Sequence, residues 1–223
     1  MTSQVEISTD NCRLCAVFGR QIDAPPGIDS PWLKDSKYAA LISFGAIVPG
    51  WTLLSPLSHA ANMQSSYADA NFWDFAAQAE AYLSARYGQV AVFEHGPIAS
   101  ESLTGCGTGH AHMHLVPLTF SLAAKAIEFD EVKSWIECSA LDVSKYAAGH
   151  EYLFVSDKFD GAQTKGLLCI LKEPTSQFFR KVIARQLGML EFSDYRKYPM
   201  LDIVETSSQQ LAADVAAHMV NIA

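Results

Sequence analysis

The stretch GCGTGHAHMHLVPL, residues 105–118, places three of the chain's seven histidines at every second position. Side chains on a β-strand point alternately to its two faces, so this spacing predicts a strand with His110, His112 and His114 on one face. The apolar residues between them would then face the core. The row is too regular and too polar to be explained by packing alone, which indicates a functional site.

Composition limits the classes of protein to which the chain can belong. Of its 223 residues, 49% are hydrophobic and 18% are charged, which predicts a substantial packed core. The net charge of −8 argues against general binding to a nucleic-acid polymer. No apolar run approaches the roughly 20 residues of a membrane span, and residues 1–10 lack the pattern of a signal peptide. We therefore expect a cytoplasmic protein with no membrane partner.

Strands and a helix are predicted before the histidine row. Apolar runs on both sides of Pro49 and Gly50 predict two antiparallel strands joined by a turn. An amphipathic stripe predicts a long helix that is capped by Asn71 and ended by Gly88. The two strands, the helix and a further strand are expected at residues 38–44, 51–54, 71–87 and 89–96.

Beyond Thr119 the pattern predicts a mixed, mainly helical segment, a pair of strands and two helices. These five segments are expected at residues 129–146, 151–156, 166–172, 175–188 and 207–222. The first of the two helices would be capped by Thr175 or Ser176. The whole chain is predicted to have an α+β fold, with a catalytic domain at residues 1–120 and an extension at residues 121–223 packed on it.

The motif HAHMHLV, with the hairpin, helix, strand and glycine-rich loop before it, resembles the signature of the histidine triad (HIT) family. The stretch FEHGPIASESLTGCGTGHAH is also similar to the galactose-1-phosphate uridylyltransferase branch of that superfamily. The resemblance covers roughly residues 10–118. It implies a HIT-like antiparallel sheet with flanking helices, to which this chain would add a C-terminal α/β extension. It also implies a nucleotide-binding enzyme that forms a homodimer.

The family's chemistry assigns roles to two of the histidines. An imidazole can attack phosphorus and form a covalent nucleotidyl-histidine, provided that a partner holds its other ring nitrogen. By the family's pattern His112 is this nucleophile and His114 is the neighbouring donor. The uridylyltransferase branch has glutamine in the third position, whereas His114 can exchange a proton with the leaving group or with water. The resemblance therefore implies a hydrolase that acts at a nucleotide α-phosphate, with a nucleotidyltransferase or phosphorylase as the alternative.

The expected substrates are a nucleoside phosphoramidate, an adenylylated compound or a dinucleoside polyphosphate. Backbone N–H groups of a glycine-rich loop can approach phosphate closely, and nearby polar side chains can add contacts. The candidate substrate-binding residues are Gly105, Gly107, Thr108, Glu94, Gln177 and Arg180. Glu94 and its neighbour His95 could equally be the end of a strand. Phe44, Ile47 and Leu53 are expected to line an apolar cleft for ribose and base.

The motif CRLC places Cys12 and Cys15 two residues apart. Alone, this spacing is compatible with a redox pair, a metal clip or coincidence. Some members of the superfamily hold a structural zinc with such a pair and two histidines. By that resemblance the ligands here would be Cys12, Cys15, His59 and His110, a closed tetrahedral set for Zn²⁺.

Two other classes of function remain open from the sequence. The histidine row could ligate a catalytic metal directly through His110, His112 and His114. Alternatively, the chain could bind a nucleotide without turning it over. A chelator that abolishes activity, with no trapped covalent nucleotide, would favour the first class. Tight nucleotide binding without turnover would favour the second.

Overall fold

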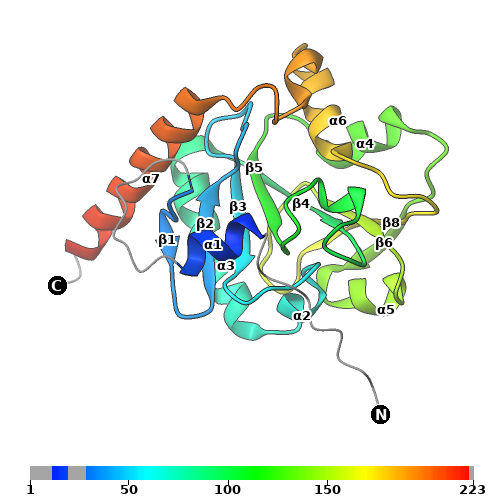
Figure 1. The fold of residues 1–223 in the computed structure, drawn as a ribbon, viewed down its shortest axis with the longest axis horizontal. Helices are drawn as coiled ribbons and strands as arrows, with labels where there is room; N and C mark the ends of the chain where they lie inside the picture. Colours follow the sequence, from blue (N-terminus) through cyan, green and yellow to red (C-terminus); the bar gives the residue numbers. More distant parts are fainter. Residues whose placement is uncertain (1–11, 20–28, 221–223) are drawn as a thin grey trace.

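The computed structural model describes residues 12–19 and 29–220. Within them, eight strands form one open sheet in the order β1-β2-β3-β5-β4-β7-β8-β6, and every neighbouring pair is antiparallel (Figure 1). The strands are β1 (Leu33–Lys34), β2 (Tyr38–Ile42), β3 (Thr52–Pro56), β4 (Val90–Gly96), β5 (Met113–Pro117), β6 (Ile136–Ser139), β7 (Tyr152–Ser156) and β8 (Lys165–Ile170). The α+β class predicted from the sequence is confirmed.

Helices cover both faces of this sheet. They are α1 (Arg13–Gly19), α2 (Gln64–Tyr67), α3 (Ala70–Tyr87), α4 (Leu122–Phe129), α5 (Val143–Ala147), α6 (Phe178–Gln186) and α7 (Leu201–Val220). Helix α3 packs on β2, β4 and β5, and α7 lies against α3 and β2. On the opposite face, Leu14 of α1 packs with Leu41 and Leu53 in a small separate cluster. None of the helices in the described ranges combines the length and the apolar composition needed to cross a bilayer.

The hairpin and the strand predicted before the histidine row are confirmed. Strands β2 and β3 pair from Tyr38 with Pro56 to Ile42 with Thr52. Gly50 in the turn between them has a φ of +78°, and a Cβ at this position would collide with the ring of Tyr87. The turn therefore needs glycine both for its backbone conformation and for the close approach of the tyrosine.

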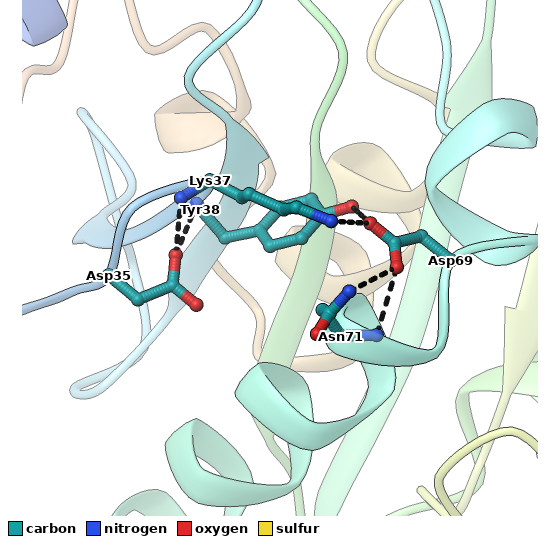
Figure 2. A network of polar contacts seen from close by, with 5 residues as sticks. All are labelled: Asp35, Lys37, Tyr38, Asp69 and Asn71. Atoms are coloured by element: carbon teal, nitrogen blue, oxygen red, sulfur yellow. Dashed lines mark hydrogen bonds and ion pairs between the residues drawn. The ribbon is translucent and has the colours of Figure 1, made fainter.

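The start of α3 differs slightly from the prediction. Its N-cap is Asp69, and the predicted cap, Asn71, lies inside the helix. The Asp69 carboxylate accepts hydrogen bonds from the backbone and side chain of Asn71, from Lys37 Nζ and from Tyr38 Oη (Figure 2). These bonds, led by the one from Lys37, hold the pKa of Asp69 well below its usual range. The network ties the helix start to β2, and Gly88 ends the helix as predicted.

The sheet continues without interruption into the C-terminal half of the chain. The predicted pair β7 and β8 is confirmed, and β7 also pairs with β4 from Val92 to Gly96. Residues 136–139 form strand β6, which corrects the prediction that residues 129–146 are mainly helical. Helix α6 begins after Gln177 with no side-chain cap, so neither Thr175 nor Ser176 caps it. Strand β4 thus has a partner on each edge.

The histidine row is only partly a strand. Strand β5 begins at Met113, so His110 and His112 lie in the irregular segment before it and only His114 lies in the strand. Ala111 and Met113 are buried in the main core, as the alternation predicted. The side chain of His110 faces a pair of cysteines, whereas His112 and His114 share a pocket.

Candidate active site and metal cluster

A pocket opens on the face of the sheet that carries α1, and residues from distant parts of the chain line it. Its polar lining includes His95, Thr108, His112, His114, Gln177 and Arg180. Its apolar lining includes Leu14, Leu41, Phe44, Trp51, Leu53 and Phe93. The pocket thus joins strands β2 to β5 with α1, the glycine-rich loop and the start of α6. Of the three residues expected in the apolar cleft, Phe44 and Leu53 line it, whereas Ile47 belongs to the core.

His112 presents a nucleophilic nitrogen to this pocket. Its Nδ1 lies 2.7 Å from the carbonyl oxygen of His110. A carbonyl only accepts hydrogen bonds, so Nδ1 carries the proton and Nε2 has the lone pair. Nε2 has no hydrogen-bond partner among the described residues, and burial lowers the pKa of His112, which favours the neutral ring. A neutral imidazole with one nitrogen held and the other available is the form that attacks phosphorus.

His114 is held in the opposite tautomer. The indole N–H of Trp51 donates to Nδ1 of His114 at 2.9 Å, so the proton of the neutral ring lies on Nε2. The ring stacks on Phe93 with 4.1 Å between centroids, and its centroid lies 4.8 Å from that of His112. Burial, together with the nearby His112, keeps the pKa of His114 well below its usual range. His114 is therefore an N–H donor beside the nucleophile. Because the Trp51 N–H occupies Nδ1, this ring lacks the second proton that the expected exchange with a leaving group requires.

Arg180 supplies a fixed positive charge. Its side chain is almost fully buried and donates to the carbonyl of Gly45 at 2.5 Å and to Ser43 Oγ at 3.2 Å. The guanidinium also lies 4.4 Å from the centre of the Trp51 ring. Burial lowers the pKa of Arg180 to about 10, so it stays charged at neutral pH. No carboxylate in the described ranges forms an ion pair with it.

Two residues that line the pocket, His95 and Gln177, each have a buried polar atom without a hydrogen-bond partner in the described ranges. The backbone N–H of Phe179 donates to Nε2 of His95 at 3.3 Å, which leaves the His95 proton on Nδ1. Among the described residues, neither that Nδ1 nor Oε1 of Gln177 has a hydrogen-bond partner, although both are buried. Unpaired buried polar groups are costly, so these atoms are suited to a polar ligand. His95 and Gln177 therefore belong to the candidate site.

The glycine-rich loop contributes less than expected. Thr108 lines the pocket, but Gly105 is buried against Pro97. Gly107 has a φ of +78°, and a Cβ there would meet the guanidinium of Arg196. These two glycines therefore allow the chain to turn and pack, and the pocket residue between them is Cys106.

Glu94 does not fit the predicted role of substrate contact. It lies on the other face of β4 from Phe93 and His95, and it is fully buried. Its carboxylate accepts hydrogen bonds from the backbone of Met63 and from the hydroxyls of Tyr67 and Tyr152, at 2.7 to 2.8 Å. The pocket lining does not include it, and its carboxylate joins α2 and β7 to β4, so Glu94 serves the packing of the sheet.

Glu94 makes the stability of the fold depend on pH. Burial raises the pKa of Glu94 from 4.5 to about 7, so the folded chain favours the protonated acid. Wild-type stability should fall as pH rises from about 5 to about 8, relative to a Glu94→Gln variant that cannot ionise. Melting temperatures of both proteins across this range would measure the difference. Parallel melting curves at every pH would contradict this prediction.

A second group of polar side chains could hold a metal ion. The ligand atoms of Cys12, Cys15, His59 and His110 all lie within 4.8 Å of one another. The Sγ atoms of Cys12 and Cys15 lie 3.3 and 3.4 Å from Nδ1 of His110, and Sγ of Cys15 lies 3.2 Å from Nδ1 of His59. A tetrahedral zinc ion separates its sulfur and nitrogen ligands by about 3.5 Å, so this cluster needs little rearrangement to bind one.

The surroundings of the cluster support ligation. Nε2 of His110 lies 2.9 Å from the carbonyl oxygen of Pro56, which requires the proton there and leaves the Nδ1 lone pair towards the cysteines. Nε2 of His59 lies 3.0 Å from Oγ of Ser100, a hydroxyl that can accept its proton when Nδ1 binds a metal. Without a metal, burial and the neighbouring Cys12 raise the pKa of Cys15 to about 11. A reactive redox pair needs a lowered thiol pKa, and the four ligand atoms lie within 4.8 Å of one another, so the cluster fits a metal clip better than a redox pair.

The cluster also separates the roles within the histidine row. Among the described residues, His110 is the only member of the row that takes part in the cluster, while His112 and His114 face the pocket. The hypothesis that all three histidines ligate one metal does not fit this division. The two sites touch at His110, whose side chain faces the cysteines while its backbone carbonyl holds His112.

Sequence reasoning missed Trp51 and gave His95 no clear role. Trp51 meets His114 only because β3 pairs with β5, and no local signal marks it. Trp51 and His95 line the pocket beside Arg180, which the sequence had indicated as a candidate substrate-binding residue. The chain matches no protein-family model and no curated protein.

Proposed function

We propose that this protein cleaves a nucleotide at its α-phosphate through a covalent nucleotidyl-His112, and that it passes the nucleotidyl group to water or to a second acceptor. One observation carries the proposal. His112, with its Nε2 lone pair, and the buried cation Arg180, which has no ion-pair partner in the described ranges, line the same pocket. Burying a cation without a counter-ion is costly, and an anionic phosphoryl group would relieve that cost.

The proposed reaction has two steps. In the first, the electron pair of His112 Nε2 forms a bond to phosphorus, and the bond from phosphorus to the leaving group breaks with its electrons on the leaving group. His112 then carries a positive charge, and its proton stays on Nδ1, hydrogen-bonded to the carbonyl of His110. In the second step the acceptor attacks phosphorus, the P–N bond breaks, and neutral His112 is restored. With water as the acceptor, the products are a nucleoside monophosphate and a proton.

The remaining pocket residues bind and orient the substrate in this proposal. Arg180, His114 Nε2–H and His95 Nδ1–H supply donors for phosphoryl oxygens, where charge develops as the bonds change. The apolar wall formed by Phe44 and Leu53 suits a ribose and a base. This division of polar and apolar lining is typical of small-molecule sites.

We further propose that the cysteine–histidine cluster holds a structural zinc ion. Its four ligands leave no open position, so the ion supplies no chemistry to the reaction. It would fix His110, and through the carbonyl of His110 it would fix the tautomer of His112. It would also hold α1 against the segment that contains His110, and Arg13 and Leu14 of α1 line the pocket.

Replacing Arg180 tests the anion site. Arg180→Met keeps the length of the side chain and removes the charge, so kcat/KM should fall by about 100-fold or more, as expected for a lost charged contact to phosphate. The variant also loses the hydrogen bonds to Gly45 and Ser43, so its melting temperature should be measured alongside, and the affinity of the folded protein for the anion is the deciding result. Arg185→Met, on the exposed face of the same helix, is the matched control. Unchanged affinity of Arg180→Met for a nucleoside monophosphate, measured by calorimetry, would rule out the anion site.

A further inference from the structure

Two imidazole N–H donors line the pocket, those of His95 and His114, and each is held in one tautomer by a hydrogen bond that its other nitrogen accepts. From this we infer that the leaving group departs as a phosphate or polyphosphate anion, and that Trp51 is a positioning residue that enforces this by keeping His114 neutral. The substrate class is then a nucleoside 5′-phosphoanhydride, as opposed to a phosphoramidate or an ester of an alcohol. This inference rests on the proposed function.

The bond between Trp51 and His114 is the main evidence. Trp51 is fully buried, and its indole N–H can only donate. To become an imidazolium, His114 would have to add a proton at Nδ1, where the indole N–H already points at 2.9 Å. The two donors would then face each other, and the hydrogen bond would be lost.

The other neighbours of His114 also disfavour a positive charge. Its ring stacks on Phe93, and the rings of His112 and His95 lie 4.8 and 6.0 Å away between centroids. The cation Arg180 lies over the same Trp51 that donates to His114. No carboxylate in the described ranges pairs with His114, and its low pKa agrees with this environment.

Cys106 and Tyr195 also line the pocket, but their protons are engaged: the Cys106 thiol donates to the carbonyl of Thr104 at 3.3 Å, and the Tyr195 hydroxyl donates to the carbonyl of Cys106 at 2.7 Å. Nε2 of His95 is occupied by the N–H of Phe179, so His95 is also a neutral donor. Asp29, the carboxylate in the lining, is ion-paired with Arg13. Arg180 does not release its proton at working pH. The donors can stabilise negative charge by hydrogen bonding, but they cannot pass a proton to a departing atom.

Leaving groups differ in whether they need that proton. When His112 attacks phosphorus in an anhydride, the bridging oxygen takes the electron pair and leaves on a phosphate. A phosphate has a second pKa near 6 and carries this charge unaided. An amine or an alcohol is strongly basic when it leaves, so it requires a general acid as the bond breaks. The pocket therefore favours the anhydride.

A matched pair of substrates tests the leaving group. Diadenosine tetraphosphate and adenosine 5′-phosphoramidate, with the corresponding uridine compounds, share the nucleoside and differ in the group that departs. We expect kcat/KM for the anhydride to exceed that for the phosphoramidate by at least 100-fold. Equal turnover of the two, with a nucleotide trapped on His112, would overturn this inference and leave the proposed function intact. Turnover of neither, with no trapped nucleotide, would overturn both.

Trp51→Phe tests the positioning role. Phenylalanine keeps an aromatic ring but removes the N–H, so Nδ1 of His114 becomes able to take a proton. The ratio of kcat/KM for the anhydride to kcat/KM for the phosphoramidate should then fall at least tenfold, mainly because phosphoramidate turnover rises. Trp32→Phe is the matched control, since the indole nitrogen of Trp32 is buried without a partner in the described ranges. An unchanged preference in Trp51→Phe would refute the role of Trp51.

The tautomer itself gives a readout that does not depend on activity. ¹⁵N NMR of the wild-type protein should show His114 protonated at Nε2 alone, whereas Trp51→Phe should show a mixture of tautomers. This measurement decides the question even if the variant is unstable. A wild-type His114 that is protonated at Nδ1, or at both nitrogens, would overturn the inference.

Discussion

His112→Ala is expected to abolish formation of the covalent nucleotidyl-protein and to lower turnover by at least about 10⁴-fold, since catalytic groups of this kind act as a unit. The fold should survive, because the side chain lines the pocket and is not part of the hydrophobic core. His112→Asn should behave in the same way, since it restores polarity without a nucleophilic ring nitrogen.

Mass spectrometry of protein quenched during turnover would detect the nucleotide on the wild-type chain and its absence on the variant. His150→Ala is a suitable control, because His150 is exposed and lies outside the pocket. Its turnover should match that of the wild type. Near-normal turnover of His112→Ala would exclude the proposed mechanism.

Loss of the cysteine–histidine cluster should affect stability more than chemistry. We expect purified protein to contain about one zinc ion per chain, and Cys12→Ser or Cys15→Ser to lose it. A ligand present at about 1,000 times its Kd stabilises the folded state by about 4 kcal/mol. For a chain of this size, that corresponds to a fall in melting temperature on the order of 10 °C.

The matched control is Cys169→Ser, which changes a buried cysteine outside the cluster. It should keep its zinc. Residual turnover of Cys12→Ser should exceed that of His112→Ala, because the proposed zinc acts on His112 only through the backbone of His110. Metal analysis that finds no zinc after reducing, chelator-free purification would contradict the proposal.

Elements with strong local patterns were predictable from the sequence. The hairpin β2–β3, helix α3 and strand β4 each combine a clear hydrophobic period with a turn or stop signal, such as Gly50 and Gly88. The exact cap of α3 was not predictable, because Asp69 and Asn71 are both good capping residues two positions apart. The choice between them depends on Lys37 and Tyr38, which are distant in the sequence.

Features created by distant pairing could not be predicted. Strand β6 shows no alternation, since Cys138 is its only buried residue, and it forms because β8 lies beside it. In the same way, nothing local marks Trp51 as the partner of His114. Arg180 was a candidate substrate-binding residue from the sequence, but only the packing of α6 shows that it is buried beside the histidines.

The double pairing of β4 has a consequence for synthesis of the chain on the ribosome. Strand β5 emerges soon after β4, but β7 emerges only after α4, β6 and α5 have been made. During that interval one edge of β4, a strand that is buried throughout in the finished fold, has no partner strand. An unpaired strand edge readily pairs with other nascent chains. Residues beyond 120 therefore protect the first half of the protein from aggregation as well as completing its pocket. A chain released before residue 156 would expose that edge permanently.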